Sequence, residues 1–297
     1  MDGVVNINKP SGMTSHDVVL RVRRILGEKR IGHAGTLDPL ATGVLVLLVG
    51  RATRIAQYIE AGEKEYRAVM RLGTTTDTLD AEGRVLETRT YAPPAREEIL
   101  RVMRGFTGEI LQCPPAYSAV KVAGVASYRL ARQGRAKPNK PRPVTVREIT
   151  LTAYEDPLVS LSVRCSKGVY IRSLCADIGD ALGPGAHLVS LERTRSGRFT
   201  IEQAVTLEAL QDVAGAGNAE SAIMPVDQAL ADFPSLSITE DEAGRIAHGG
   251  RIPRISQDAA VRAGPVRLHD PSGRLAALAR FENDVVRPEL VFPAINE

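Results

Sequence analysis

The sequence predicts an α+β protein with a larger N-terminal unit and a small β-rich C-terminal unit. Its 297 residues exceed the length of a typical single domain. Several stretches alternate between apolar and polar residues, as half-buried strands do, and others carry apolar residues at helical spacing. A linker at Asp232–Pro234 separates the two units, which we expect to span residues 1–232 and 235–297.

The N-terminal stretch predicts a strand, a helix and a second strand. Val4–Ile7 has the pattern of a short strand, and Ser15 is placed to cap a helix over His16–Leu26. The apolar run Val44–Val49 has the length of a fully buried strand. Arg51–Ile59 is expected to be helical.

The next elements are a strand, a turn region and a helix. Lys64–Gly73 alternates and predicts a half-buried strand. Tyr66 falls on its apolar face, either as a core aromatic or as a platform on which an extruded base stacks. Thr74–Gly83 is interpreted as structural turns, because it lacks the acidic alternation of a calcium-binding loop. Arg96–Arg104 predicts a helix.

The end of the larger unit predicts a strand at Leu158–Cys165 and a helix that ends near Leu182. Between them, Tyr170 and Arg172 are two residues apart, and on one strand face both would point into the same cleft. The Gly/Ala-rich stretch Asp212–Ala219 predicts a surface loop.

The C-terminal unit predicts one helix among short strands. Thr239–Glu242 has the pattern of a capping box that opens a helix. Val266–His269 and Leu275–Phe281 flank the turn Asp270–Gly273, which indicates a β-hairpin.

A glycine-punctuated segment from Gly32 to Leu45 carries a single carboxylate, Asp38. Pro39 disfavours the α region for Asp38 and places it in an extended or turn conformation. An acid on a stiff loop anchored by a buried strand suits a nucleophile or a base, and an Asx-turn has the same local pattern. The residues alone leave both interpretations open.

Residues 110–147 contain no Asp or Glu, although average composition predicts about four or five in such a length. A phosphate-facing surface explains this better than a solvated basic loop, because cations that neutralise phosphates gain affinity by releasing counterions. The residues that we assign to RNA binding are Arg129, Arg132, Arg135, Lys137, Lys140 and Arg142.

Other properties exclude several classes of protein. The net charge of +3 does not by itself identify a nucleic-acid-binding protein. Three widely spaced cysteines predict no disulfide framework, and five scattered histidines show no zinc-ligand spacing. No stretch has the pattern of a signal peptide or the apolar length of a membrane span. We therefore expect a cytoplasmic protein without metal or membrane segment.

Four motifs of this chain resemble those of the TruB family of tRNA pseudouridine synthases. The segment around Asp38 matches the pattern G-x-L-D-P-x-A-x-G-L/V-L throughout Gly35–Leu45. The other matches are K-P-x-G-x-x-S at Lys9–Ser15, G-x-Y-I-R-S/T-L at Gly168–Leu174, and L-x-R-x-x-S/T-G at Leu191–Gly197.

The resemblance implies a pseudouridine-synthase catalytic domain with a mixed, mainly antiparallel sheet and flanking helices. A basic insertion at about residues 110–147 would grip the tRNA, and residues 235–297 would form a PUA-like RNA-binding domain. Asp38 would be catalytic, and Arg172 would pair with it and keep it ionised. His33, Tyr66, Tyr170 and Leu191 would surround the substrate, with Lys9 and Pro10 as structural neighbours.

The implied reaction converts uridine 55 in the TΨC loop of tRNA into pseudouridine. It adds and removes nothing overall, so we expect no cofactor, no obligatory protein partner and a monomeric enzyme. No second acid stands beside Asp38 in the sequence, which argues against the two-carboxylate pair of a glycosidase. Two alternatives remain, a guide-RNA-dependent member of the same superfamily and a tRNA-binding folding chaperone.

Overall fold

The computed structural model describes residues 1–118, 120–122, 125–133, 135, 139–253 and 258–292. Within these residues the larger unit is built on a sheet of nine strands. In spatial order its strands are β1 (Gly3–Lys9), β3 (Thr42–Val49), β12 (Ala186–Ser196), β4 (Lys64–Leu72), β11 (Leu158–Cys165), β10 (Arg142–Glu155) and β7 (Gly108–Gln112), with β2 (Ile31–His33) beside β3 and β13 (Phe199–Thr200) beside β12.

Antiparallel pairing dominates this sheet, as the sequence predicts. β3 and β12 form a short parallel pair, whereas the other named pairings of the described sheet are antiparallel. Two smaller hairpins pair β5 (Thr74–Thr76) with β6 (Val85–Thr88), and β8 (Lys121–Val122) with β9 (Val125–Ala126). The mixed, mainly antiparallel α+β class is therefore confirmed.

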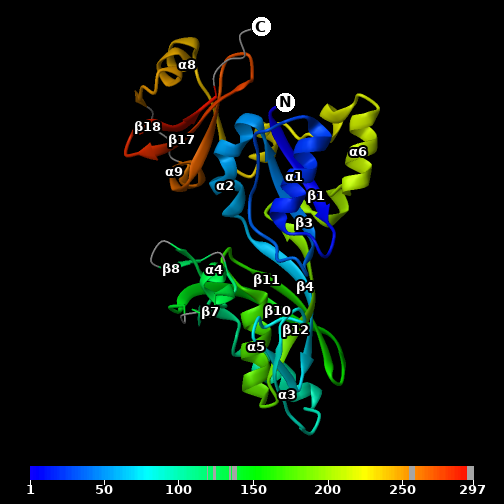
Figure 1. Ribbon diagram of the computed structural model, residues 1–297. Helices are drawn as coiled ribbons and strands as arrows, with labels where there is room; N and C mark the ends of the chain where they lie inside the picture. The colour runs from blue at the N-terminus through cyan, green and yellow to red at the C-terminus, as the bar shows by residue number, and fades with distance from the viewer. Residues whose placement is uncertain (119, 123–124, 134, 136–138, 254–257, 293–297) are drawn as a thin grey trace.

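Helices flank both faces of the sheet (Figure 1). They are α1 (Ser15–Leu26), α2 (Ala56–Glu60), α3 (Arg96–Arg104), α5 (Ile171–Leu182), α6 (Leu207–Gly215) and α7 (Val226–Ala229), whereas α4 (Ser127–Arg132) lies away from the sheet. Short 3₁₀ turns occupy Gly50–Ile55, Ile201–Gln203 and Ala219–Ala222.

β3 is buried on both faces, which explains its continuous apolar sequence. Leu45, Leu47 and Val49 belong to the core that includes α1, α3 and α5. The alternate residues Val44, Val46 and Leu48 belong to a second core, which also contains Leu278 and Leu290 of the C-terminal unit. The strand that follows Asp38 is thus fixed from two sides.

The C-terminal unit is a five-stranded sheet with two helices in the described residues. Its elements are β14 (Ser235–Ser237), α8 (Glu240–Ala247), β15 (Ile252–Pro253), α9 (Ala259–Ala263), β16 (Pro265–His269), β17 (Leu275–Glu282) and β18 (Val285–Val291). The predicted capping box is present, because Thr239 Oγ1 accepts from Glu242 N at 3.3 Å and Glu242 Oε2 accepts from Thr239 N at 2.8 Å. The predicted hairpin is the antiparallel pair β16–β17.

Four local predictions were wrong. The described part of the C-terminal unit has two helices, α8 and α9, where one was predicted. Thr14 rather than Ser15 caps α1, since the Thr14 hydroxyl accepts from Asp17 N. α5 begins at Ile171, so Arg172 lies in a helix and not on a strand face with Tyr170. α6 runs to Gly215 through half of the predicted loop, because Thr206 caps it and its apolar residues pack on the core.

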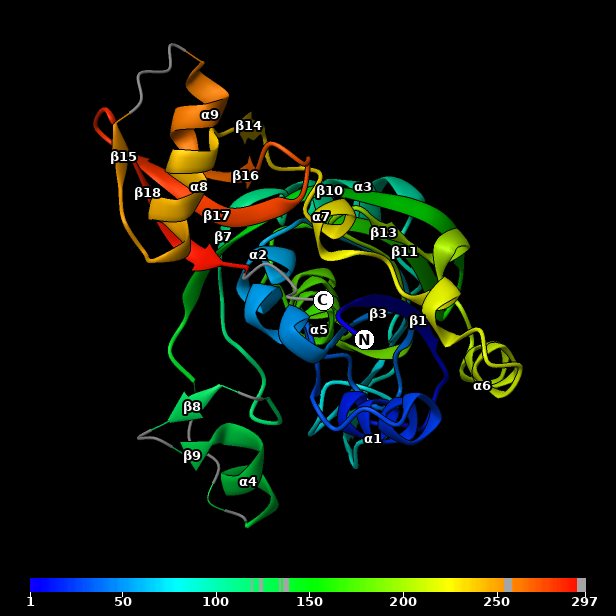
Figure 2. The same ribbon diagram turned by 90° about the horizontal axis from the view of Figure 1, so that it is seen from above.

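The segment that carries β8, β9 and α4 stands away from the rest of the molecule (Figure 2). It begins after β7, ends where β10 begins, and lies within the acid-free region 110–147. We call residues 113–142, up to the first residue of β10, the basic arm. None of the helices in the described part of the chain has the length and apolarity that a membrane span requires.

Candidate active site

Asp38 lies on the loop between β2 and β3, and its side chain is 35% exposed. Arg172, on the first turn of α5, is only 4% exposed and faces this carboxylate. Nη2 of Arg172 donates to Asp38 Oδ1 at 3.2 Å, and Nε lies 2.9 Å from Oδ2 as an ion-pair contact without hydrogen-bond geometry. The two planar groups therefore face each other through two contacts, which fixes the direction of the carboxylate.

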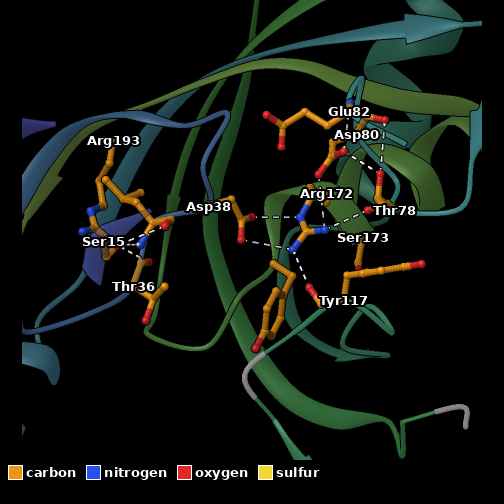
Figure 3. A network of polar contacts seen from close by, with 12 residues as sticks. Ser15, Thr36, Asp38, Thr78, Asp80, Glu82, Tyr117, Arg172, Ser173 and Arg193 are labelled. Atoms are coloured by element: carbon orange, nitrogen blue, oxygen red, sulfur yellow. Dashed lines mark hydrogen bonds and ion pairs between the residues drawn. The ribbon is translucent and has the colours of Figure 1, made fainter. Parts of the chain in front are cut away.

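The remaining donors of Arg172 reach two other segments (Figure 3). Nη1 donates to Thr78 O at 2.8 Å and lies 3.3 Å from Asp80 Oδ2. Nη2 also donates to Tyr117 O at 2.9 Å, at the base of the basic arm. One guanidinium thus joins the Asp38 loop, the turn after β5 and the basic arm.

The turn after β5 is itself constrained. Leu79 has a φ of +64°, a left-handed conformation that is strained for a side chain of this type. Asp80 holds the turn closed by accepting from Thr78 Oγ1 at 2.5 Å and from Glu82 N at 3.1 Å. Thr74–Gly83 is structural, as predicted, but it also presents a carbonyl and a carboxylate to Arg172.

The structure therefore corrects the expectation that no second acid lies near Asp38. Asp80 shares Arg172 with it, and Glu60 lines the same pocket. The Asp80 side chain is only 6% exposed, its Oδ1 accepts two hydrogen bonds and its Oδ2 faces Arg172, whereas Asp38 is accessible. Asp38 is thus the carboxylate that is both oriented and open to a ligand.

Carbonyl groups of the Asp38 loop are held by buried side chains. Lys9, which is fully buried, donates to Pro39 O at 3.2 Å, to Ala41 O at 2.6 Å and to Pro10 O at 2.8 Å. The hydroxyl of Ser15 accepts from Leu37 N at 2.8 Å and donates to Leu37 O at 3.0 Å. Ser15 thus binds the loop instead of capping α1.

Arg193 holds the same loop from the other side. It is 1% exposed and donates from Nε to Val44 O at 2.8 Å, from Nη2 to Gly35 O at 3.1 Å and from Nη1 to Thr36 O at 3.4 Å. Sequence reasoning missed the roles of Arg193 and Asp80. Both lie inside stretches that it singled out, but the contact of Asp80 with Arg172 and the contacts of Arg193 join distant segments and leave no local pattern.

A pocket of about 250 Å³ opens beside Asp38. Five predicted site residues line it, namely Asp38, Tyr66, Tyr170, Arg172 and Leu191. His33 does not: it ends β2 outside this lining, and burial lowers the pKa of its imidazole. Tyr66 and Leu191 are buried, 8% and 7% exposed, and contribute an aromatic and an apolar surface.

Burial dominates the electrostatics of the pocket. Desolvation raises the pKa of Asp38, and Arg172 opposes this shift without cancelling it. Arg172 thus favours the ionised carboxylate, as expected, but its effect on the pKa is smaller than the opposing effect of desolvation. Burial also lowers the pKa of Lys9 to about 8 and raises the pKa of the Tyr66 and Tyr170 hydroxyls, which favours their protonated forms.

The residues assigned to RNA binding lie on the basic arm. Arg135, Lys140 and Arg142 are exposed. Arg129 and Arg132 belong to α4, but their side chains lie outside the described residues, as does the whole of Lys137. Among the described residues, no group of three or more His, Cys, Asp or Glu side chains is arranged to hold a metal ion.

Replacement of Arg172 by methionine should raise the pKa of Asp38 further. The substitution removes the positive charge that favours the ionised carboxylate and leaves the desolvation unchanged. Asp38 would then be ionised only at higher pH than in the wild type. A ¹³C NMR titration of labelled aspartate carboxyls measures this, with Arg195→Met as the control, since Arg195 pairs with Glu65. An unchanged Asp38 titration would contradict the assignment.

Models of known families match all the residues that line the pocket, whereas Lys9 and Ser15 precede the first matched residue. The TruB family pseudouridylate synthase N-terminal domain matches residues 23–171, and the tRNA pseudouridylate synthase B C-terminal domain matches residues 172–231. A model described as tRNA pseudouridine synthase II, C-terminal, matches residues 233–293.

Full-length relatives agree with these matches. The tRNA pseudouridine synthase B of Thermobifida fusca is 46% identical over 98% of both chains. That of Burkholderia lata is 44% identical over 97% of this chain and 89% of its own. Among solved structures, the Cbf5–Nop10–Gar1 complex aligns with a TM-score of 0.77 and 32% identity over 98% of this chain and 85% of the matched chain. The chain therefore belongs to the TruB family of pseudouridylate synthases, which are isomerases.

Proposed function

We propose that this isomerase converts uridine 55 in the TΨC loop of tRNA into pseudouridine, with Asp38 as the nucleophile. Relatives at 43–46% identity over nearly the full length bear the name tRNA pseudouridine synthase B, which supports tRNA as the substrate. The solved structures of H/ACA ribonucleoproteins align at lower identities, 29% and 30%. This difference favours an enzyme that acts on tRNA without a guide RNA.

The main observation in support of this proposal is that Asp38 is both oriented and accessible. Its carboxylate is oriented by two contacts from a buried arginine, and it remains 35% exposed toward the pocket. A carboxylate held in one direction with a free approach is suited to forming a covalent bond with a substrate. Asp80, the nearby alternative, is enclosed by its own donors.

The reaction breaks the N1–C1′ bond of uridine and forms a C5–C1′ bond. The proton on C5 is lost, and N1 gains a proton. A covalent adduct with Asp38 divides this rearrangement into two easier steps and leaves the carboxylate free at the end. Ionised Asp38 is the reactive form, so activity should fall as the pH falls through its raised pKa.

Tyr66, Tyr170 and Leu191 are proposed to hold the base. A uridine in a structured loop must leave its stack to reach the carboxylate. Tyr66 and Leu191 would then contact the two faces of the uracil, while His33, outside the pocket, would act only near the vacated position. The pKa of Tyr66 is raised, so its hydroxyl keeps the proton that it would donate to the base.

The rest of the chain is proposed to grip the RNA. Residues 1–232 would form the catalytic domain, and residues 235–297 a PUA-like domain that adds binding surface. Supporting observations are the exposed cations of the basic arm and the five-stranded C-terminal sheet. We propose a cytoplasmic monomer that needs no protein partner or cofactor.

Replacement of Asp38 by asparagine should abolish turnover and change tRNA affinity by no more than about threefold, because the side chains are nearly isosteric. The measurement is tritium release from a T-arm stem-loop labelled at C5 of the target uridine, with EDTA present. Residual activity only tenfold below the wild type would exclude the nucleophile role. Intact binding without release from either protein would favour the chaperone or a guide-dependent enzyme.

Neutralisation of Arg135, Lys140 and Arg142 should weaken tRNA binding and reduce the slope of log K against log salt by up to about 3 units, because each phosphate contact contributes to that slope. Binding titrations at several salt concentrations measure it. Arg21, Arg24 and Arg30, at a distance along the chain, provide a matched triple control. A slope that stays unchanged would show that the arm does not contact phosphates.

A further inference from the structure

Arg193 has an environment that is unusual for a buried cation. Its side chain is 1% exposed, and among the described residues no carboxylate lies within ion-pair distance of it. Its partners are the main-chain carbonyls of Gly35, Thr36 and Val44. A guanidinium remains charged at all ordinary pH values, so its desolvation is compensated by these oriented carbonyls.

The three carbonyls lie on both sides of Asp38. Gly35 and Thr36 precede it, and Val44 follows it on β3. One planar group thus ties together the entry and the exit of the loop. The fork geometry of arginine allows this, whereas a lysine ammonium in the same place could not present donors at such separated positions.

The main chain of Arg193 strengthens the connection. It pairs with Gly43 of β3 on one side and with Tyr66 of β4 on the other. Gly43 has a φ of +96°, and a Cβ at this position would collide with the Arg193 carbonyl. The C-terminal end of the loop therefore packs directly against the backbone of Arg193.

Arg193 also interacts with Tyr66. A hydrogen bond and the charge of Arg193 both favour ionisation of the Tyr66 hydroxyl, against the effect of burial. Arg193 itself lines the pocket that Asp38 and Tyr66 line. The same side chain thus contacts the loop that carries the acid and the aromatic residue that faces it.

We propose that Arg193 is a positioning residue that sets the distance between Asp38 and the base held against Tyr66. It does not touch the reacting atoms. It fixes the Asp38 loop against β12 and the Tyr66 strand, so that the carboxylate meets a base already seated in the pocket. This inference rests on the proposed nucleophile role of Asp38.

The test compares Arg193→Lys, Arg193→Ala and the control Arg195→Lys, whose parent residue lies on the same strand but pairs with Glu65. Arg193→Lys keeps the positive charge and loses the planar guanidinium with its separated donors. We expect kcat to fall about 100-fold, as for a misplacement of about 1 Å, with tRNA affinity and KM within about threefold and a cooperative thermal transition retained. Arg195→Lys should keep the wild-type kcat.

Chemical rescue distinguishes a role of Arg193 in positioning from a role in folding. Added guanidinium ion should restore part of the kcat of Arg193→Ala, because the pocket gives access to the vacated site, and sodium chloride at equal concentration should not. A wild-type kcat in Arg193→Lys, or a loss confined to tRNA affinity, would overturn the inference. Failure of both variants to fold would also overturn it, since Arg193 would then serve the fold as a whole.

Different results would contradict the proposed function and the positioning role of Arg193. If Asp38→Asn kept its turnover, the nucleophile assignment would be wrong. If Asp38→Asn were inactive while Arg193→Lys kept the wild-type kcat, only the positioning role would be wrong.

Discussion

The contact between Arg172 and Asp38 is the interaction on which the site depends. The guanidinium is nearly inaccessible and takes partners from the Asp38 loop, from the turn at Thr78–Asp80 and from Tyr117 at the base of the basic arm. A buried charge is stable only when its donors are satisfied, so each of these segments must be in place for the others to be. The arrangement links the position of the proposed RNA-gripping arm to the direction of the carboxylate.

The second constraint acts on the backbone. Lys9 and Arg193 are buried cations that donate to carbonyls of the Asp38 loop. Those bound by Lys9 follow Asp38, those bound by Arg193 lie on both sides of it, and Ser15 binds Leu37. Such a loop has few alternative conformations, which preorganises Asp38 and removes the cost of ordering it during the reaction. Burial raises the pKa of Asp38, so the site is arranged for direction and access more than for maximal acidity.

Local patterns predicted most of the elements, and the resemblance to the TruB family predicted five of the residues that line the pocket. The alternation of Lys64–Leu72 and the apolar run of β3 are direct consequences of burial on one face and on two faces, respectively. The start of α5 was not predictable locally, because the side chain of Gln112, 58 residues away, holds the backbone of Tyr170 just before the helix. The roles of Asp80 and Arg193 were not predicted for the same reason. Arg172, the ion-pair partner of Asp80, and the carbonyls that Arg193 binds are distant in sequence, and only the folded chain brings them together.

The measurement that tests this account most directly is a double-mutant cycle on kcat for Asp80→Asn and Arg172→Lys. If Asp80 acts through Arg172, the double variant should be no slower than Arg172→Lys alone, within about threefold, because the second substitution removes a partner that has already lost its function. Losses that multiply in the double variant would contradict the account. They would show that Asp80 and Arg172 contribute independently and that the shared guanidinium does not organise the site.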